Sequence, residues 1–285
     1  MGLRARPLRV PGRHLAWAGG AVLAGAGLVA LAIPTAGGAT SEATPRARAT
    51  TPADPAGKAS PAVKASPAGH AFTGVAAVGA LFPAGGKHFC TASVVHSPAG
   101  DLAVTAAHCV GGHGSSMVFV PGFHDGQAPY GTWPVTRVYT DAAWQSSQDP
   151  DDDVAFLQLG LTAGVPIENV TGSEAMATSD GPDADDTTPA LVQVIGYPQD
   201  TDQPVWCVNW AHAFSTTQRE FDCGGYRNGT SGGPFLTNVD PKSGQGTVIG
   251  VIGGYEQGGD TDAVSYAAVF DSSVVTLYQS AVNDG

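Results

Sequence analysis

A serine set between glycines is the main candidate in this chain for covalent chemistry. Ser231 lies in the stretch Gly229–Phe235 (GTSGGPF), shortly before an apolar run from Val248 to Ile252. On a tight turn its hydroxyl is exposed, and nearby backbone N–H groups are free to point at a ligand. Acyl transfer requires these two features of a nucleophile and its oxyanion hole. Because Gly-Ser turns are common in β-rich proteins, the stretch needs a base and an orienting acid elsewhere.

A histidine at the end of an apolar strand is the candidate base. His108 lies in Thr105–Val110 (TAAHCV), next to Cys109, which a disulfide would hold in place. A general base needs a fixed ring orientation, and such anchoring would supply it. A lone histidine in a turn is more often structural, but none of the other seven histidines has comparable surroundings.

An acidic cluster that runs into an apolar strand offers the carboxylate. Asp151, Asp152 and Asp153 directly precede the run Val154–Leu157. Asp153 is nearest to the strand, so we expect it to be drawn inside, where it could accept a hydrogen bond from the histidine and select its tautomer. We expect Asp151 and Asp152 to face water.

Short β-branched and aromatic runs follow one another from Ala71 to Phe270, separated by Gly, Pro, Asp and Ser clusters. This spacing predicts an all-β sandwich or barrel. The apolar positions of Ser272–Val282 predict a short terminal helix. At 285 residues the chain can bury one large core or two smaller ones.

The N-terminus has the pattern of a secretory signal. Four arginines precede an uncharged segment, Leu15–Ile33, and small residues follow up to Ala39. We predict a signal peptide over 1–39, with an uncleaved membrane anchor as the alternative, because the apolar run approaches the ~20 residues of a membrane span. Residues 40–70 are rich in Ala, Pro, Thr and Ser, so we predict a disordered propeptide or linker. The folded domain is then 71–285, and the expected location is extracellular.

Charge excludes several classes of partner. From Ala71 onward five basic residues stand against 23 acidic ones, a net charge of −18. Such a surface disfavours nucleic acid and anionic membrane, so we expect no membrane contact once the signal is cleaved. The sequence indicates no cofactor and no oligomer, and we expect a monomer.

The four cysteines are Cys90, Cys109, Cys207 and Cys223. An even number in a secreted chain suggests disulfides, for which three pairings are possible, the sequence-local one joining 90 to 109 and 207 to 223. No CxxC motif is present, so no metal site is predicted. The aspartates of 180–186 could bind Ca²⁺, but a solvated loop is the expected structure.

The three motifs occur in the order His, Asp, Ser, and together they resemble the chymotrypsin-like (trypsin-like) serine peptidases over about Val75 to Leu277. The resemblance implies two six-stranded antiparallel β-barrels with the active site between them. It also implies that a Cys90–Cys109 disulfide braces the histidine loop.

By this resemblance Ser231 is the nucleophile, His108 the general base and then acid, and Asp153 the orienting carboxylate. The N–H groups of Gly229 and Ser231 would form the oxyanion hole, with glycine needed at 229 so that its amide can face inward. The implied activity is that of a serine endopeptidase acting on proteins or peptides through an acyl-enzyme.

Substrate contacts are implied at four further residues. Gly225 falls where trypsin-type enzymes carry a basic-selecting aspartate, so we predict preference for an apolar or bulky side chain over Arg or Lys. Gly253, Gly254 and Tyr255 fall where the family offers a strand edge to the substrate backbone.

Thr230 departs from the animal enzymes, which carry an aspartate before the serine for an activating ion pair with a freed N-terminus. The pattern is closer to bacterial secreted members, including those similar to glutamyl endopeptidases. Two alternatives stay open: a catalytically inactive extracellular binding protein on the same scaffold, and a membrane-tethered peptidase.

Overall fold

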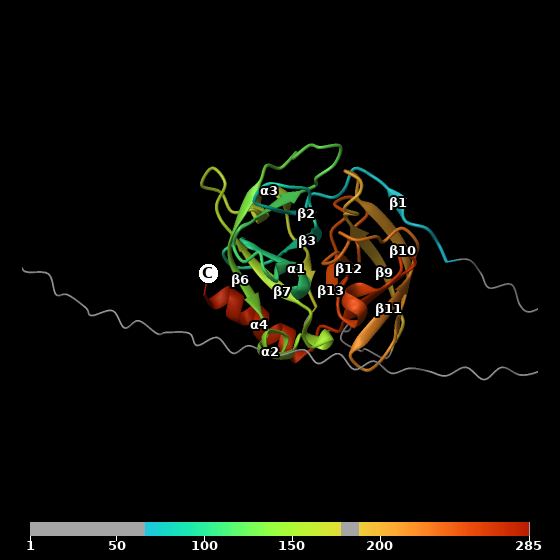
Figure 1. Cartoon of the computed structure of the whole chain (residues 1–285). Coiled ribbons are helices and arrows are strands. Elements are labelled where there is room, and N and C mark those ends of the chain that lie inside the picture. Colours follow the sequence, from blue (N-terminus) through green and yellow to red (C-terminus); the bar gives the residue numbers. More distant parts are fainter. Residues whose placement is uncertain (1–65, 178–187, 285) are drawn as a thin grey trace, which may run out of the picture. The chain divides into compact units, whose positions relative to one another are not determined.

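The computed structural model describes residues 66–177 and 188–284 (Figure 1). The predicted signal peptide, residues 40–65 of the predicted linker and the 180–186 aspartates lie outside the described residues. The predicted domain start at Ala71 falls inside the short strand β1 (His70–Ala71). Among the described residues, no helix is long and apolar enough to cross a bilayer.

Six strands of the first half close into an antiparallel barrel in the order β2-β3-β4-β7-β6-β5. They are β2 (Val78–Pro83), β3 (Cys90–Val95), β4 (Leu102–Thr105), β5 (Met117–Pro121), β6 (Trp133–Thr140) and β7 (Ala155–Leu159). Every residue of β3 and β4 is buried, which explains their continuous runs of small and β-branched side chains.

Six strands of the second half form a sheet in the order β14-β11-β10-β9-β12-β13. They are β9 (Ala190–Gly196), β10 (Val205–Ala213), β11 (Gln218–Asp222), β12 (Pro234–Thr237), β13 (Thr247–Val251) and β14 (Val264–Ala268). Ile252, just beyond β13, bridges to Ala267 in β14, so the sheet edges meet at one point. The predicted fold class is confirmed, with the first half fully closed and the second joined by this single bridge. The short β1 and β8 (Ala175–Met176) add to β10 and β13.

Helical segments are short, as expected of an all-β chain. They are α1 (Ala107–Val110), α2 (Ala142–Ser147), η1 (Pro150–Asp152), α3 (Glu168–Thr171), η3 (Tyr255–Gly258) and the terminal α4 (Ser272–Asn283). The predicted terminal helix is thus present, and it packs on β6 and β7. Asp271 caps it by accepting hydrogen bonds from the N–H groups of Ser273 and Val274.

Candidate active site

Strand pairing brings the candidate base and acid together. Thr105, the last residue of β4, pairs with Ala155, the first of β7. Because these strands are antiparallel, the residues after Thr105 lie beside those before Ala155. His108 and Asp153 are therefore neighbours in space although 45 positions apart in sequence.

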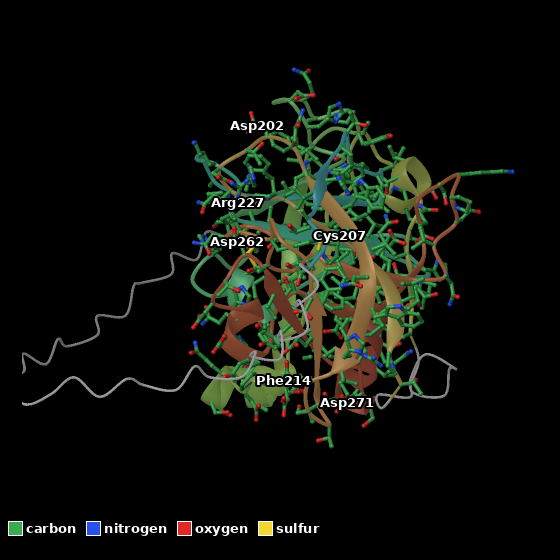
Figure 2. All side chains as sticks on the ribbon, turned by 90° about the vertical axis from the view of Figure 1, so that its right-hand side faces the viewer. Asp202, Cys207, Phe214, Arg227, Asp262 and Asp271 are labelled. Atoms are coloured by element: carbon green, nitrogen blue, oxygen red, sulfur yellow. A yellow bond between two sulfur atoms is a disulfide. The ribbon has the colours of Figure 1, made fainter. Side chains whose placement is uncertain are left out.

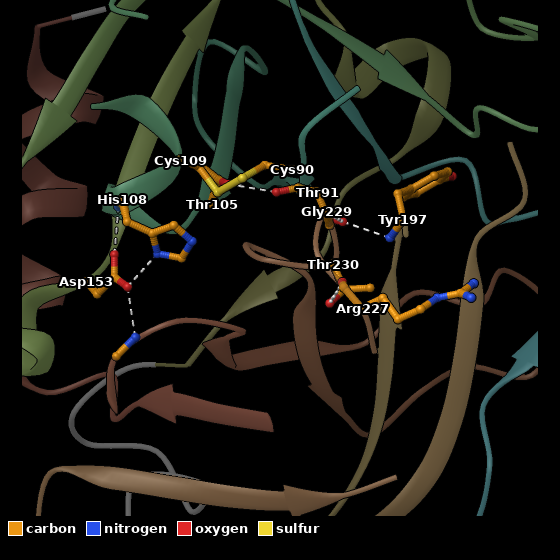
Figure 3. The surroundings of a disulfide bond; sticks show 11 residues. Cys90, Thr91, Thr105, His108, Cys109, Asp153, Tyr197, Arg227, Gly229 and Thr230 are labelled. Carbon is orange, nitrogen blue, oxygen red and sulfur yellow. Dashed lines mark hydrogen bonds and ion pairs between the residues drawn. A yellow bond between two sulfur atoms is a disulfide. The ribbon is translucent and has the colours of Figure 1, made fainter. Parts of the chain in front are cut away.

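Three N–H groups converge on the Asp153 carboxylate (Figure 3). Oδ2 lies 2.7 Å from His108 Nδ1 and accepts the backbone N–H of Gly254 at 2.9 Å, while Oδ1 accepts the backbone N–H of His108 at 2.8 Å. Asp153 is 1% exposed. Because an ionised carboxylate only accepts, Nδ1 is the donor, and Nε2 is left with a lone pair that can take a proton.

A disulfide fixes the other side of the histidine loop. Cys109 in α1 is bonded to Cys90 in β3, and a second disulfide joins Cys207 in β10 to Cys223. These are the sequence-local pairs. The sulfur atoms of Cys90 and Cys109 lie close to His108, but as disulfide atoms they supply no thiolate for a metal.

The serine turn is held by both halves of the molecule. Ser231 C=O accepts the N–H of Thr91 in β3 at 2.7 Å, and the N–H of Gly232 donates to Ile252 O at 2.7 Å. Gly229 has φ +100°, and a Cβ there would lie 2.6 Å from Tyr197 O and from Gln199 N. Only glycine fits this position.

Two amides of this turn are free to bind a ligand. In the described part of the chain, neither the N–H of Gly229 nor that of Ser231 donates a hydrogen bond. The N–H groups of Thr230 and Gly233 are bonded instead, to Arg227 O and Thr230 O. The unbonded amides are those expected of an oxyanion hole.

His108, Gly229 and Ser231 line one cleft of about 1240 Å³. Phe89 and Cys90 add to it from the first half, and Tyr226, Ile252 and the segment 256–262 from the second. Asp153 lies behind His108, out of the cleft. The arrangement can hold a carbonyl substrate between a serine hydroxyl and a histidine with an oriented ring.

The structure places the four predicted substrate residues beside this cleft rather than along its lining. Gly253 and Gly254 are buried, and their N–H groups donate to Tyr266 O and Asp153. Tyr255 is exposed and donates its N–H to Gln218 Oε1, while Gly225 donates to Asp262 O. Their contact with substrate stays a prediction.

Sequence reasoning missed two features of the site. One is the donor role of Gly254 toward Asp153, and the other is the cleft wall formed by 256–262. A glycine pair after a strand carries no signal for the first. The second is a loop of Glu, Gln, Gly, Asp and Thr outside the three motifs, so no pattern marked it.

The wall of the cleft is acidic. Its lining includes four carboxylates and two cationic side chains: Asp200, Glu256, Asp260, Asp262, Lys87 and Arg227. Arg227 forms an ion pair with Asp200 at 3.0 Å. The negative charge of Glu256 raises the pKa of the nearby Tyr255, with a hydrogen bond to Glu256 and the charge of Asp260 adding to the shift. Carboxylates therefore outnumber the cationic Lys and Arg side chains along this lining.

Thr230 occupies the position before the serine as an uncharged, buried residue. Its Oγ1 donates to Arg227 O at 2.9 Å, and it is 3% exposed. It packs on Gly196, where a Cβ would come within 2.6 Å of the threonine Cβ. No carboxylate is present at this position to receive a buried N-terminal amine.

The fold and this site together define a two-barrel protein of the serine-peptidase type. A model of the trypsin family matches residues 67–274, and the chain belongs to this family. The family implies peptide substrates, although it includes inactive members.

Solved structures with the same fold include proteases and a binding protein. Protease Anisep from Arthrobacter nicotinovorans aligns with TM-score 0.64 and 22% identity, covering 75% of this chain and 99% of that one. A Glu endopeptidase aligns with TM-score 0.59 and 18% identity over 78% and 98%. Human heparin binding protein aligns with TM-score 0.56 and 14% identity over 77% and 97%. A comparison with curated proteins found no match.

Proposed function

We propose that this protein is a secreted serine endopeptidase that hydrolyses peptide bonds through an acyl-enzyme. The observation that carries the proposal is the orientation of His108, which belongs to a disulfide-anchored helix, is hydrogen-bonded to the buried Asp153 and lines the same cleft as Ser231. The His108–Asp153 hydrogen bond, and the cleft that His108 and Ser231 both line, support these roles in nucleophilic catalysis.

In the proposed mechanism Ser231 Oγ attacks the scissile carbonyl carbon while His108 Nε2 takes the hydroxyl proton. Asp153 stabilises the resulting imidazolium, and the amides of Gly229 and Ser231 bind the oxyanion. The C–N bond then breaks as His108 returns the proton to the leaving amine. Water, activated by the same histidine, hydrolyses the ester and restores Ser231.

Ser231→Ala tests the proposal directly. We expect casein hydrolysis and labelling by a fluorophosphonate probe to vanish in this variant. The matched control is Ser146→Ala, on the exposed surface of α2, which should keep both. Equal hydrolysis by Ser231→Ala and the unmodified protein would contradict the proposal.

A non-catalytic binding protein is the second candidate, because one structural neighbour is named for heparin binding. The net charge of −18 beyond Ala71 opposes binding of that polyanion. Folded protein that fails to label with the probe would favour this candidate.

Secretion and tethering are separated by processing of the N-terminus. We propose that the signal over 1–39 is removed. N-terminal sequencing of the extracellular protein would contradict this if the chain still began near Met1, which would favour the membrane-tethered peptidase.

A further inference from the structure

Six residues ahead of the first barrel lie against the second half of the molecule. We call Pro67–Phe72 the N-terminal strap. Its central part pairs in parallel with Gly224, whose N–H donates to Pro67 O at 2.8 Å and whose C=O accepts the N–H of Gly69 at 2.6 Å. Both backbone groups of Gly224 are therefore bonded to the strap.

The rest of the strap is anchored on β10, beside which β1 lies in Figure 1. His70 pairs with Trp206 and Ala71 with Val205, and the N–H of Phe72 donates to Pro204 O at 3.1 Å. The ring of Trp206 lies 5.9 Å from that of His70 and 6.4 Å from that of Phe72. The strap thus joins β10 to Gly224 by main-chain bonds and ring packing.

Gly224 opens the segment that leads to the cleft. Cys223 before it is anchored to β10 by a disulfide, and Gly225 after it has φ +101°. Two successive glycines have the largest backbone freedom of any residue pair, so they must be held to adopt one path. The N–H groups of Gly225 and Tyr226 both donate to the backbone oxygen of Asp262. Asp262 is labelled in Figure 2.

The far end of the same segment is held from elsewhere. Asn228 O accepts the N–H of Gln199 at 2.7 Å, and Gly229 O accepts Thr91 Oγ1 at 3.0 Å. Between the two ends, Tyr226 to Ser231 line the cleft. The path of residues 224–231, which include the expected oxyanion-hole amides, is therefore fixed at its start by the strap and near its end by Thr91 of the first barrel.

We infer that the strap is a positioning element for residues 224–231, a role that rests on the proposed function. Its bonds are made by internal backbone groups and need no free α-amino group. Uncharged Thr230 is consistent with this, because no ion pair is required to hold the segment. It follows that maturation must leave the chain intact from Pro67 onward.

Two proline substitutions in the full chain test the inference. Gly69→Pro removes the N–H that donates to Gly224 O. Ala68→Pro is the matched control, because the N–H of Ala68 donates no hydrogen bond within the described residues. The measurements are kcat and KM on a fluorogenic peptide, amide hydrogen exchange over 224–231, and the thermal midpoint.

We expect Gly69→Pro to lose about ten-fold or more in kcat/KM, chiefly in kcat, because misplaced oxyanion donors weaken transition-state binding. Exchange over 224–231 should accelerate while the thermal midpoint stays close to that of Ala68→Pro. Unchanged exchange and kcat in Gly69→Pro would overturn the inference. So would a fully active mature protein that begins after Pro67.

Exchange also separates this inference from the proposed function. If neither the unmodified protein nor Ala68→Pro hydrolyses peptides, the proposed function fails, and the exchange rates still report whether the strap orders the segment. If Gly69→Pro does not fold, Phe72→Ala loosens the strap through lost packing on Trp206 with the backbone intact. Faster exchange over 224–231 in that variant supports the inference, and unchanged exchange overturns it.

Discussion

At the scale of single residues, Asp153 is the group on which the orientation of the histidine depends. We predict that Asp153→Asn lowers kcat by about 10³- to 10⁴-fold, because an amide nitrogen facing one of the three N–H donors disfavours the required tautomer of His108. The measurement is steady-state hydrolysis of a fluorogenic peptide. Asp152→Asn is the control, since its carboxylate bonds Ser273 outside the cleft, and comparable losses in both variants would contradict the assignment.

Glu174 is a buried carboxyl group outside the site. It is fully buried, its Oε2 accepts the N–H of Gly246 at 2.5 Å, and its Oε1 has no partner among the residues that the structure describes. Burial raises its pKa to about 8, against a partial lowering by the Gly246 bond. The folded protein therefore keeps this proton over a pH range in which the unfolded chain has lost it.

The resulting stability change has a definite sign. Between the unfolded pKa of 4.5 and about 8, the folded state binds more protons, so stability falls as pH rises and levels off above the folded pKa. The contribution of one group is at most about 1.4 kcal/mol per pH unit. We predict that Glu174→Gln flattens this part of the stability curve, measured by urea unfolding at several pH values. An unchanged slope in the variant would contradict the prediction.

At the scale of elements, the turn between β11 and β12 depends on Gly229. We predict that Gly229→Ala costs about 1–3 kcal/mol of stability and at least about 100-fold in kcat, because its Cβ would press on the backbone at Tyr197 and Gln199 and displace an oxyanion donor. Gly112→Ala is the matched control, since Gly112 has φ +81° but open space around it. Urea unfolding and peptide hydrolysis measure the two effects, and equal effects of both substitutions would show that backbone strain alone is responsible.

At the scale of the whole molecule, Thr91 links the first barrel to the serine turn. Its buried Oγ1 donates to Gly229 O at 3.0 Å and accepts the N–H of Tyr197 at 2.9 Å. We predict that Thr91→Val, which keeps the shape, costs about 2 kcal/mol or more, because two buried groups lose their partner, and that it lowers kcat. Thr91→Ser keeps the hydroxyl and should retain most of the activity. The thermal midpoint and hydrolysis rates decide, and parity of the two variants would argue against this link.

The sequence by itself determined the fold class and the candidate roles of His108, Asp153 and Ser231, and it left three disulfide pairings open, of which the structure has the sequence-local one. Each of these depends on short-range information: a residue type, its immediate neighbours and the order of the motifs. Chain separation hides the remaining partners, because a hydrogen bond between Gly254 and Asp153, 101 positions apart, leaves no periodicity to detect. Only the tertiary structure decided that Gly254 orients the acid, that 256–262 form the cleft wall, and that Pro67–Phe72 pair with Gly224. Backbone groups make most of these contacts, and because every residue type has nearly the same backbone, no sequence pattern records where they meet.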